Sequence, residues 1–186
     1  FPIKSFGNEI DYSKAVSFAV MNFVNYSGDY RATDIMMPLI LEAANNKLVN
    51  IYNPTQLRKI LRKYRIRTAG KISVEAASKI KNELDVSYLI LGSIDFYKQS
   101  EPFEIGVTIR ILDLANIKLS YSNSYSVTNI ESMKIFGLGK INDIEKLARK
   151  VTSKIFEDIT IEKLQLNSIS DNSDLKIAVV PFDNIS

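Results

Sequence analysis

The chain has 186 residues, of which 46% are hydrophobic and 24% charged, and its formal net charge at pH 7 is +3. This composition is typical of a globular protein with a full core, and no apolar run reaches the roughly 18 residues that a membrane-spanning helix needs. The absence of cysteine and histidine excludes disulfide bonds, Cys/His zinc sites and histidine-assisted nucleophilic catalysis within this chain. Because no methionine precedes Phe1, we expect a processed or trimmed chain whose signal segment is not visible.

The first half of the chain alternates short apolar runs with helical patterns. Residues 1–15 are expected to form an amino-terminal arm, because Pro2 and Gly7 disfavour a helix there. An apolar, β-branched and aromatic run predicts a buried strand over residues 16–24. Further patterns predict a helix over 31–46, a short strand over 48–52, and helices over 56–64 and 73–84.

The second half is dominated by strands. A continuous apolar run predicts a second buried strand over residues 86–94, and strict alternation over 104–112 predicts a strand with one exposed face. A serine- and tyrosine-rich strand is expected over 118–127, and an apolar stripe at helical spacing predicts a last helix over 142–158.

Together these elements give the order β-α-β-α-α-β-β-β-α, which favours an α/β (α+β) fold with a mixed sheet of about five strands covered by helices. The stretch from Phe18 to Ser27 returns as Ile177 to Ser186, with identical residues at five of ten positions. We therefore expect one domain over residues 16–160, a Ser- and Asn-rich linker over 161–174, and the first strand of a second, truncated domain over 175–186.

Three polar groupings are weak candidates for chemistry. The turn with Asn25, Ser27 and Asp29 has no activating histidine, and it is better explained by bonds to nearby backbone. The glycine-rich residues 136–140 lack the preceding buried strand and third glycine of a phosphate-binding loop. Acidic residues near the turns of the sheet could pair as acid and base, but any domain rich in carboxylates offers such pairs; they are Asp95, Glu101, Glu104 and Asp113.

The most informative polar feature is a basic run with no acidic residue inside it, made of Arg58, Lys59, Arg62, Lys63, Arg65, Arg67 and Lys71. Like charges four residues apart on a helix repel slightly. A surface that tolerates this repulsion is a candidate site for an anionic partner, such as nucleic acid, lipid head groups, an acidic protein or the cell wall. The alternative is a solvated helix face that acidic side chains elsewhere in the fold neutralise.

Tyr121 and Tyr125 share one face of the expected strand over 118–127. Paired aromatics of this kind stack the bases of single-stranded nucleic acid. They equally suit an interaction face that packs against a neighbouring protein domain, which is the interpretation we favour.

The order of these segments resembles a known family of envelope domains. An Ala-Val-x-x-Phe-x-Asn-x-Ser strand and turn precedes a long helix, Arg65 to Gly70 links two helices, and Tyr88 to Ile94 and Val107 to Asp113 follow. In this order they resemble the domains related to the curli-secretion channel lipoprotein and to the amino-terminal domain of TolB. The segments near 100–103 and 114–118 are too short for the membrane-spanning hairpins of the secretion channel.

The resemblance implies a non-enzymatic assembly domain, periplasmic or associated with the outer membrane, in a secretion, flagellar or cell-wall complex. Its expected partners are proteins of such a complex, including further copies of itself, and an anionic lipid or cell-wall surface. No cofactor and no small-molecule substrate are expected. The same fold resembles anticodon-binding domains, so a nucleic-acid-binding module using Arg58 to Lys71 is the alternative function.

Overall fold

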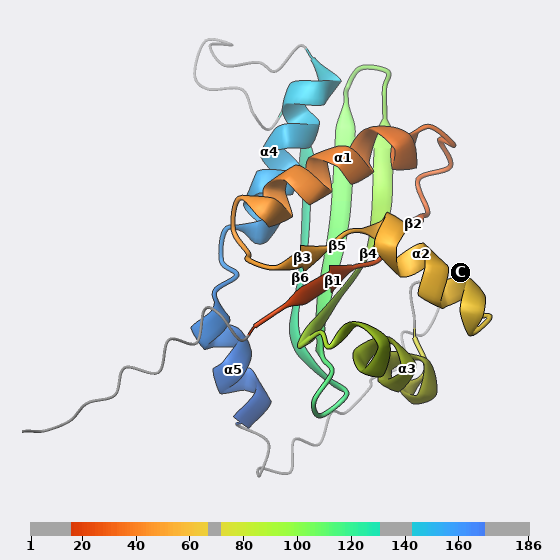
Figure 1. Ribbon diagram of the computed structural model, residues 1–186. Coiled ribbons are helices and arrows are strands. Elements are labelled where there is room, and N and C mark those ends of the chain that lie inside the picture. The colour runs from red at the N-terminus through yellow and green to blue at the C-terminus, as the bar shows by residue number, and fades with distance from the viewer. Residues whose placement is uncertain (1–15, 67–71, 131–142, 170–186) are drawn as a thin grey trace, which may run out of the picture.

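A computed structural model of the chain describes residues 16–66, 72–130 and 143–169. Within these ranges a six-stranded mixed sheet packs against five helices (Figure 1). The fold class predicted from the sequence is therefore confirmed, and the sheet is open rather than closed into a barrel.

The elements follow one another much as predicted. The first half contains β1 (Phe18–Val20), β2 (Val24–Asn25), α1 (Ala32–Asn45), β3 (Ile51–Tyr52), α2 (Pro54–Lys63) and α3 (Val74–Leu84). The second half contains β4 (Tyr88–Lys98), β5 (Glu104–Asp113), β6 (Lys118–Thr128), α4 (Ile144–Phe156) and α5 (Ile161–Ile169).

The strand order in the sheet is β3-β1-β4-β5-β6, with β2 also paired to β4. The short strands β1, β2 and β3 run parallel to their neighbours, whereas β4, β5 and β6 form an antiparallel meander. β4 is central and β6 is the long strand at one edge. Short connections join β4 to β5 and β5 to β6, as antiparallel neighbours allow.

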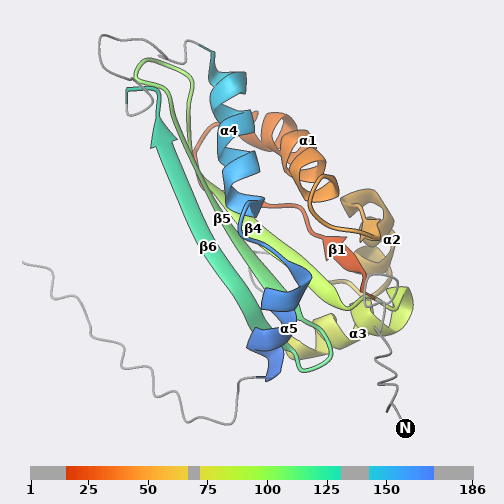
Figure 2. The ribbon, with the colours of Figure 1, turned by 90° about the vertical axis from the view of Figure 1, so that its left-hand side faces the viewer.

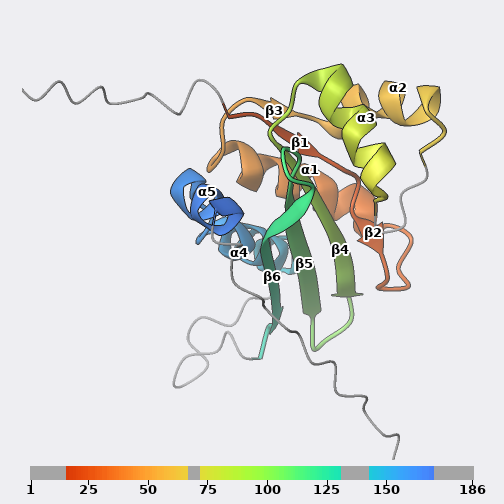
Figure 3. The same ribbon diagram turned by 90° about the horizontal axis from the view of Figure 1, so that it is seen from below.

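Each face of the sheet has its own apolar core, because successive side chains of a strand point to opposite faces. The first core joins alternate residues of the strands, such as Phe18, Ile90 and Ile109, to α1, α4 and α5. The second core joins residues such as Ala19, Leu89 and Leu91 to α2 and α3. Figures 2 and 3 show α4 and α5 on one side of the sheet and α3 on the other.

The strand predicted over residues 16–24 is divided into β1 and β2. Phe23 lies between them with its ring against Gly92 and its backbone N–H 3.4 Å from the Met37 sulfur atom. This backbone makes a side-chain contact instead of a sheet hydrogen bond, so the ladder with β4 is interrupted.

Part of the expected linker is helical. Residues 161–169 form α5, and Leu164 of this helix is fully buried in the first core. The side-chain amide of Asn167 donates a 2.8 Å hydrogen bond to the carbonyl oxygen of Ser120 in β6. The expected arm over 1–15 and the expected strand over 175–186 lie outside the described residues, and the division into domains stays a prediction.

Candidate interaction surfaces

Four of the predicted basic residues stand on α2, and the start of this helix is fixed by a capping box. The Asn53 side-chain oxygen accepts hydrogen bonds from the backbone N–H groups of Thr55 and Gln56 at 2.9 and 3.1 Å, and the Gln56 side chain accepts one from the Asn53 N–H at 2.8 Å. Leu57 and Ile60 are buried in the second core. The opposite side of the helix therefore faces water.

Four of the predicted basic residues form what we call the basic surface, namely Arg58, Lys59, Arg62 and Arg65. All four side chains are exposed, and none of them makes an ion pair with another described residue. Arg67 and Lys71 lie outside the described residues. The structure thus brings five of the seven predicted cations together at and just after α2, and four of them have no ion pair with a described residue.

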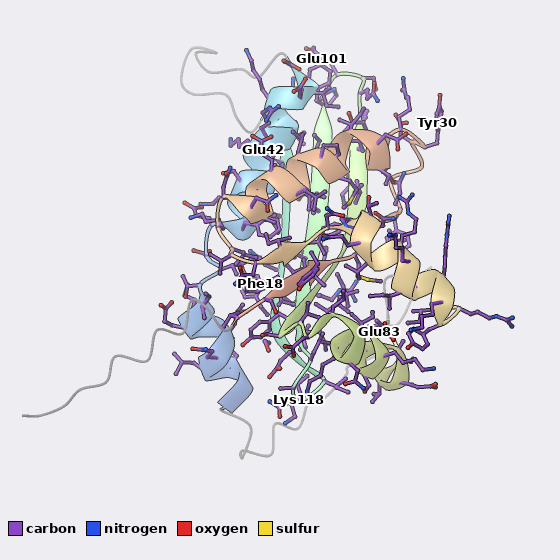
Figure 4. All side chains as sticks on the ribbon, in the orientation of Figure 1. Phe18, Tyr30, Glu42, Glu83, Glu101 and Lys118 are labelled. Carbon is purple, nitrogen blue, oxygen red and sulfur yellow. The ribbon has the colours of Figure 1, made fainter. Side chains whose placement is uncertain are left out.

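Lys63 is different, because α3 supplies a counter-charge. Its ammonium group lies 2.6 Å from a carboxylate oxygen of Glu83, which also accepts a hydrogen bond from the Tyr64 hydroxyl (Figure 4). The hydrogen bond from Lys63 lowers the pKa of Glu83, and the same contact raises the pKa of Lys63. Lys63 and Lys79 both lie over the Tyr64 ring, 4.9 and 5.5 Å from its centre.

Tyr121 and Tyr125 lie on the helix-covered face of β6. Both are half-buried and pack against the first core, and burial raises the pKa of the Tyr121 hydroxyl. Their rings therefore help to hold the sheet to the helices of their own domain, and only part of each remains in contact with water. Their role as an interaction face stays a prediction.

One surface was not predicted from the sequence. It lies on the sheet face that packs against α2 and α3, where β4, β5 and β6 extend past these helices. It bears a row of hydrogen-bonded polar side chains across three strands. Asp95 accepts from the hydroxyl groups of Ser93 and Thr108, both at 2.6 Å, and Thr108 and Ser124 share a further bond of 2.8 Å. The alternating serines of residues 118–127 were the available signal, since they predict a solvated strand face.

Phe96 is an exposed apolar residue on this polar face. Its side chain is 52% exposed although it lies in β4, and its ring covers Gly106, where an added Cβ would come within 2.7 Å of the ring. Phe96 lines a shallow hollow together with Thr108, Ser124 and Ser126. A single exposed apolar side chain is common on protein surfaces, and here it lies beside a row of hydroxyl groups.

The weaker candidates are not assembled into one site. Asn25 at the end of β2 and Ser27 in the following turn bond to each other and to the backbone, and Asp29 pairs with Arg31 at 3.1 Å. The pKa of Asp29 is lowered by its bonds to Arg31. Glu104 and Asp113 lie at opposite ends of β5, and residues 136–140 lie outside the described residues.

Membrane-spanning helices and metal clusters are both absent from the described part of the chain. No helix in it is long and apolar enough to cross a membrane. The described ranges also contain no group of three or more acidic, histidine or cysteine side chains that could hold a metal ion.

The chain was compared with known proteins by sequence and by structure. No model of a protein family and no curated protein sequence matches it. Among solved structures, lipoprotein GNA1162 from Neisseria meningitidis matches with a TM-score of 0.53 and 16% identity, over 78% of this chain and 99% of that chain. This likeness shows a shared fold.

Two other solved structures are similar at lower scores. PelC from Paraburkholderia phytofirmans, solved as a dodecamer, matches with a TM-score of 0.47 and 15% identity over 80% of this chain and 86% of that chain. TolB from Acinetobacter baumannii matches with a TM-score of 0.41 and 12% identity, over 76% of this chain and 27% of that chain. TolB is thus among the matches, and the resemblance to the curli-secretion channel lipoprotein stays a prediction.

Proposed function

We propose that this chain is a non-enzymatic interaction domain of the bacterial cell envelope, periplasmic or associated with the outer membrane, that takes part in assembling an envelope complex. The observation that carries the proposal is the fold shared with lipoprotein GNA1162. Fold alone does not fix function, so the surfaces matter as well. The uncovered sheet face around Phe96 and the basic surface on α2 are two separate places where partners can bind.

Location is the first test. A chromosomally tagged copy is followed in the cells of origin by protease treatment of intact cells, spheroplasts and lysed spheroplasts. The proposal predicts that the tagged protein is degraded in spheroplasts while a cytoplasmic marker survives. Protection of both until lysis would contradict an envelope function.

Contact with a partner is the second test. A photo-crosslinking amino acid placed at Phe96 is expected to capture an envelope protein in vivo. The matched control places the same amino acid at Leu166, which is 65% exposed on α5. Equal capture from both positions would remove the sheet face from the proposal.

Binding of nucleic acid is the second candidate function, because Arg58, Lys59, Arg62 and Arg65 make no ion pair with other described residues. A protein that neutralises phosphates releases counterions, so its affinity falls steeply as salt rises. Fluorescence anisotropy with a labelled single-stranded RNA and a DNA duplex, at roughly 50 to 200 mM salt, measures this slope.

Two double variants with the same change in net charge make the anisotropy test specific. Arg58→Glu/Arg62→Glu alters the basic surface, whereas Lys47→Glu/Lys146→Glu alters exposed lysines of α1's end and α4. If the basic surface binds phosphates, only the first variant loses affinity and salt dependence. A flat salt response of the unaltered protein would eliminate this candidate.

A further inference from the structure

The edge strand β6 contains a palindromic sequence. Residues 120–126 read Ser-Tyr-Ser-Asn-Ser-Tyr-Ser, which is the same in both directions about Asn123. β6 is the last strand in the sheet order and pairs only with β5 among the described strands. Among the described elements no strand pairs with its outer edge, along which backbone N–H and C=O groups point outward.

Over residues 121–128 this edge lacks the charges and the proline that normally prevent pairing between molecules, and the register of β6 with β5 shifts between Leu119 and Tyr121. Proteins protect long edge strands with charged side chains, proline or bulges along the edge. Residues 119–128 contain no charged residue and no proline. The other edge of the sheet is β3, which has only two residues.

We propose that two copies of this chain associate by antiparallel pairing of β6 with β6 about a two-fold axis at Asn123. In such a pair, the residue a given number of positions after Asn123 in one copy lies opposite the residue the same number of positions before Asn123 in the other copy. Asn123 then faces Asn123, each Tyr121 faces Tyr125 of the other copy, and each Ser122 faces Ser124. No like charges meet, and the six-stranded sheet continues into the second copy.

The burial of these side chains agrees with this register. Residues directly opposite in an antiparallel pair share one face of the sheet. Tyr121, Asn123 and Tyr125 lie half-buried on the helix-covered face, and Ser122 and Ser124 are exposed on the other face. The two tyrosines are already held by the core, so pairing them across the axis costs little side-chain freedom.

α5 sets the limit of the pairing. Its Asn167 side chain occupies the carbonyl oxygen of Ser120, and α5 lies beside the lower end of β6 in Figure 2. The Asn167 bond lies just before residues 121–125, so the pairing centres on these five residues. A short edge of this kind predicts a weak dimer that forms with rising concentration.

This inference gives the proposed interaction domain one partner, a second copy of the same chain. Its evidence comes from β6 and not from the likeness to envelope proteins. Its first test is sedimentation equilibrium of the purified full chain over a range of concentrations. Monomer–dimer equilibrium is expected for the unaltered protein. Asn123→Lys is expected to raise the dimer dissociation constant at least about tenfold, because two ammonium groups would face each other across the axis.

Two matched variants control this measurement. Asn123→Thr keeps the position neutral and is expected to retain the dimer, and Ser153→Lys adds the same charge on the exposed surface of α4 and is expected to have no effect. Circular dichroism and thermal melting confirm that each variant is folded. A protein that stays monomeric, or a dimer indifferent to Asn123→Lys, overturns the proposal.

Cysteine crosslinking tests the register without relying on folding of the lysine variant. Opposite Cα atoms in an antiparallel pair lie about 4.5 to 5.5 Å apart, within the range for a disulfide bond. Asn123→Cys is expected to crosslink to itself in mild oxidant. Ser122→Cys and Ser124→Cys are expected to crosslink well only when the two variants are mixed, because Ser122 of one copy lies opposite Ser124 of the other. Within a dimer of either variant alone, the two cysteines are diagonal neighbours about 7 to 8 Å apart.

Each crosslinking outcome decides the register. Ser153→Cys, remote on α4, sets the rate of random collision. Preferential crosslinking of the Ser122→Cys and Ser124→Cys mixture supports the axis at Asn123. Equal rates for the mixture, the separate variants and Ser153→Cys overturn it, and such a failure leaves the test of envelope location untouched.

Discussion

Gly92 in β4 has no room for a side chain, because the Phe23 ring lies directly over its backbone. A Cβ atom at this position would lie 2.2 Å from the ring, and Phe23 itself is buried. Gly92→Ala is therefore expected to overpack the first core and to lower the free energy of unfolding by about 1 to 3 kcal/mol. Urea unfolding followed by circular dichroism measures the change.

A double-mutant cycle shows whether the ring is the cause. Phe23→Leu removes the part of the ring nearest Gly92, so Gly92→Ala should cost less in the Phe23→Leu protein than in the unaltered protein. Additive costs would mean that the strain at Gly92 comes from the backbone and not from Phe23.

Glu83 gives the stability of the α2–α3 contact a dependence on pH. Its pKa in the folded protein is lowered below the usual 4.5 by Lys63, so its contribution is present above that value and is lost as the pH falls through the lowered pKa. Glu83→Gln should thus reduce the urea midpoint at pH 7, and the difference from the unaltered protein should shrink towards zero in acid. The amide oxygen that this substitution introduces can still accept a hydrogen bond from Tyr64.

Lys63→Gln provides the control for this pH dependence. If the ion pair is responsible, Lys63→Gln alone loses the same pH-dependent stability as Glu83→Gln alone. Adding Glu83→Gln to the Lys63→Gln protein then causes no further loss. Because the pair is at the surface, the effect should also decrease in high salt. A difference at pH 7 that persists unchanged in acid would assign the effect to packing.

Some backbone conformations at this scale could not be read from the sequence. Arg65, Asp85 and Ile117 have φ angles of 53°, 50° and 53°, in the left-handed region that favours glycine. Local sequence preference gives no warning at Arg65 and Ile117, whereas aspartate, as at Asp85, adopts this region more readily. Arg65, for example, follows the end of α2, where the Ile66 N–H bonds to the Leu61 carbonyl oxygen at 2.8 Å, so the closing of the helix determines the conformation.

At the scale of elements, α5 shows most clearly what packing adds to sequence pattern. Leu164 is 0% exposed and Leu166 is 65% exposed on the same helix. Leu164→Ala is expected to lower the free energy of unfolding by about 2 to 5 kcal/mol, and Leu166→Ala to change it by less than about 0.5 kcal/mol. Urea unfolding of the two variants gives both values.

The pair of leucine variants also decides whether this segment is part of the domain. They remove the same atoms from the same helix, so helix propensity changes equally in both. If residues 161–169 acted only as a linker, neither substitution would matter. Equal, small effects would therefore contradict the packing of α5 on the sheet.

The long elements were predictable because their apolar residues repeat at the spacing of a helix or a strand, as in α2 and β5. The exceptions were decided by distant contacts. Residues 161–169 look like a linker from their serine and asparagine neighbours, yet Leu164 is held by the first core. The break between β1 and β2 depends on Phe23, Met37 and Gly92, which are far apart in the sequence.

At the scale of the whole molecule, the candidate surfaces were only partly predictable. The basic run is visible in the sequence, but its partner Glu83 lies 20 residues beyond Lys63 and meets it only when α2 and α3 pack together. The bonded row from Ser93 to Ser124 requires three strands in register. Sequence periodicity assigns faces to each strand, but it does not say which part of a face the helices leave uncovered.

The sheet order predicts how amide hydrogen exchange is distributed over the molecule. β4 has strands on both sides and is buried from Tyr88 to Ile94, so its amides should exchange only with global unfolding. In dilute protein, β6 should show alternating protection, because every second amide points to β5 and the others point outward. Two-dimensional NMR at each exchange time separates the two sets.

The outward amides of β6 also report on its edge as concentration changes. If two copies pair through residues 121–125, these amides should become protected in concentrated protein, while exchange in β4 stays the same. If all β6 amides are as slow as those of β4 even in dilute protein, another segment of the same chain covers the edge. If protection in β6 stays alternating at every protein concentration, its edge remains in water and the two copies do not pair. The absence of charged residues along β6 would then have another cause.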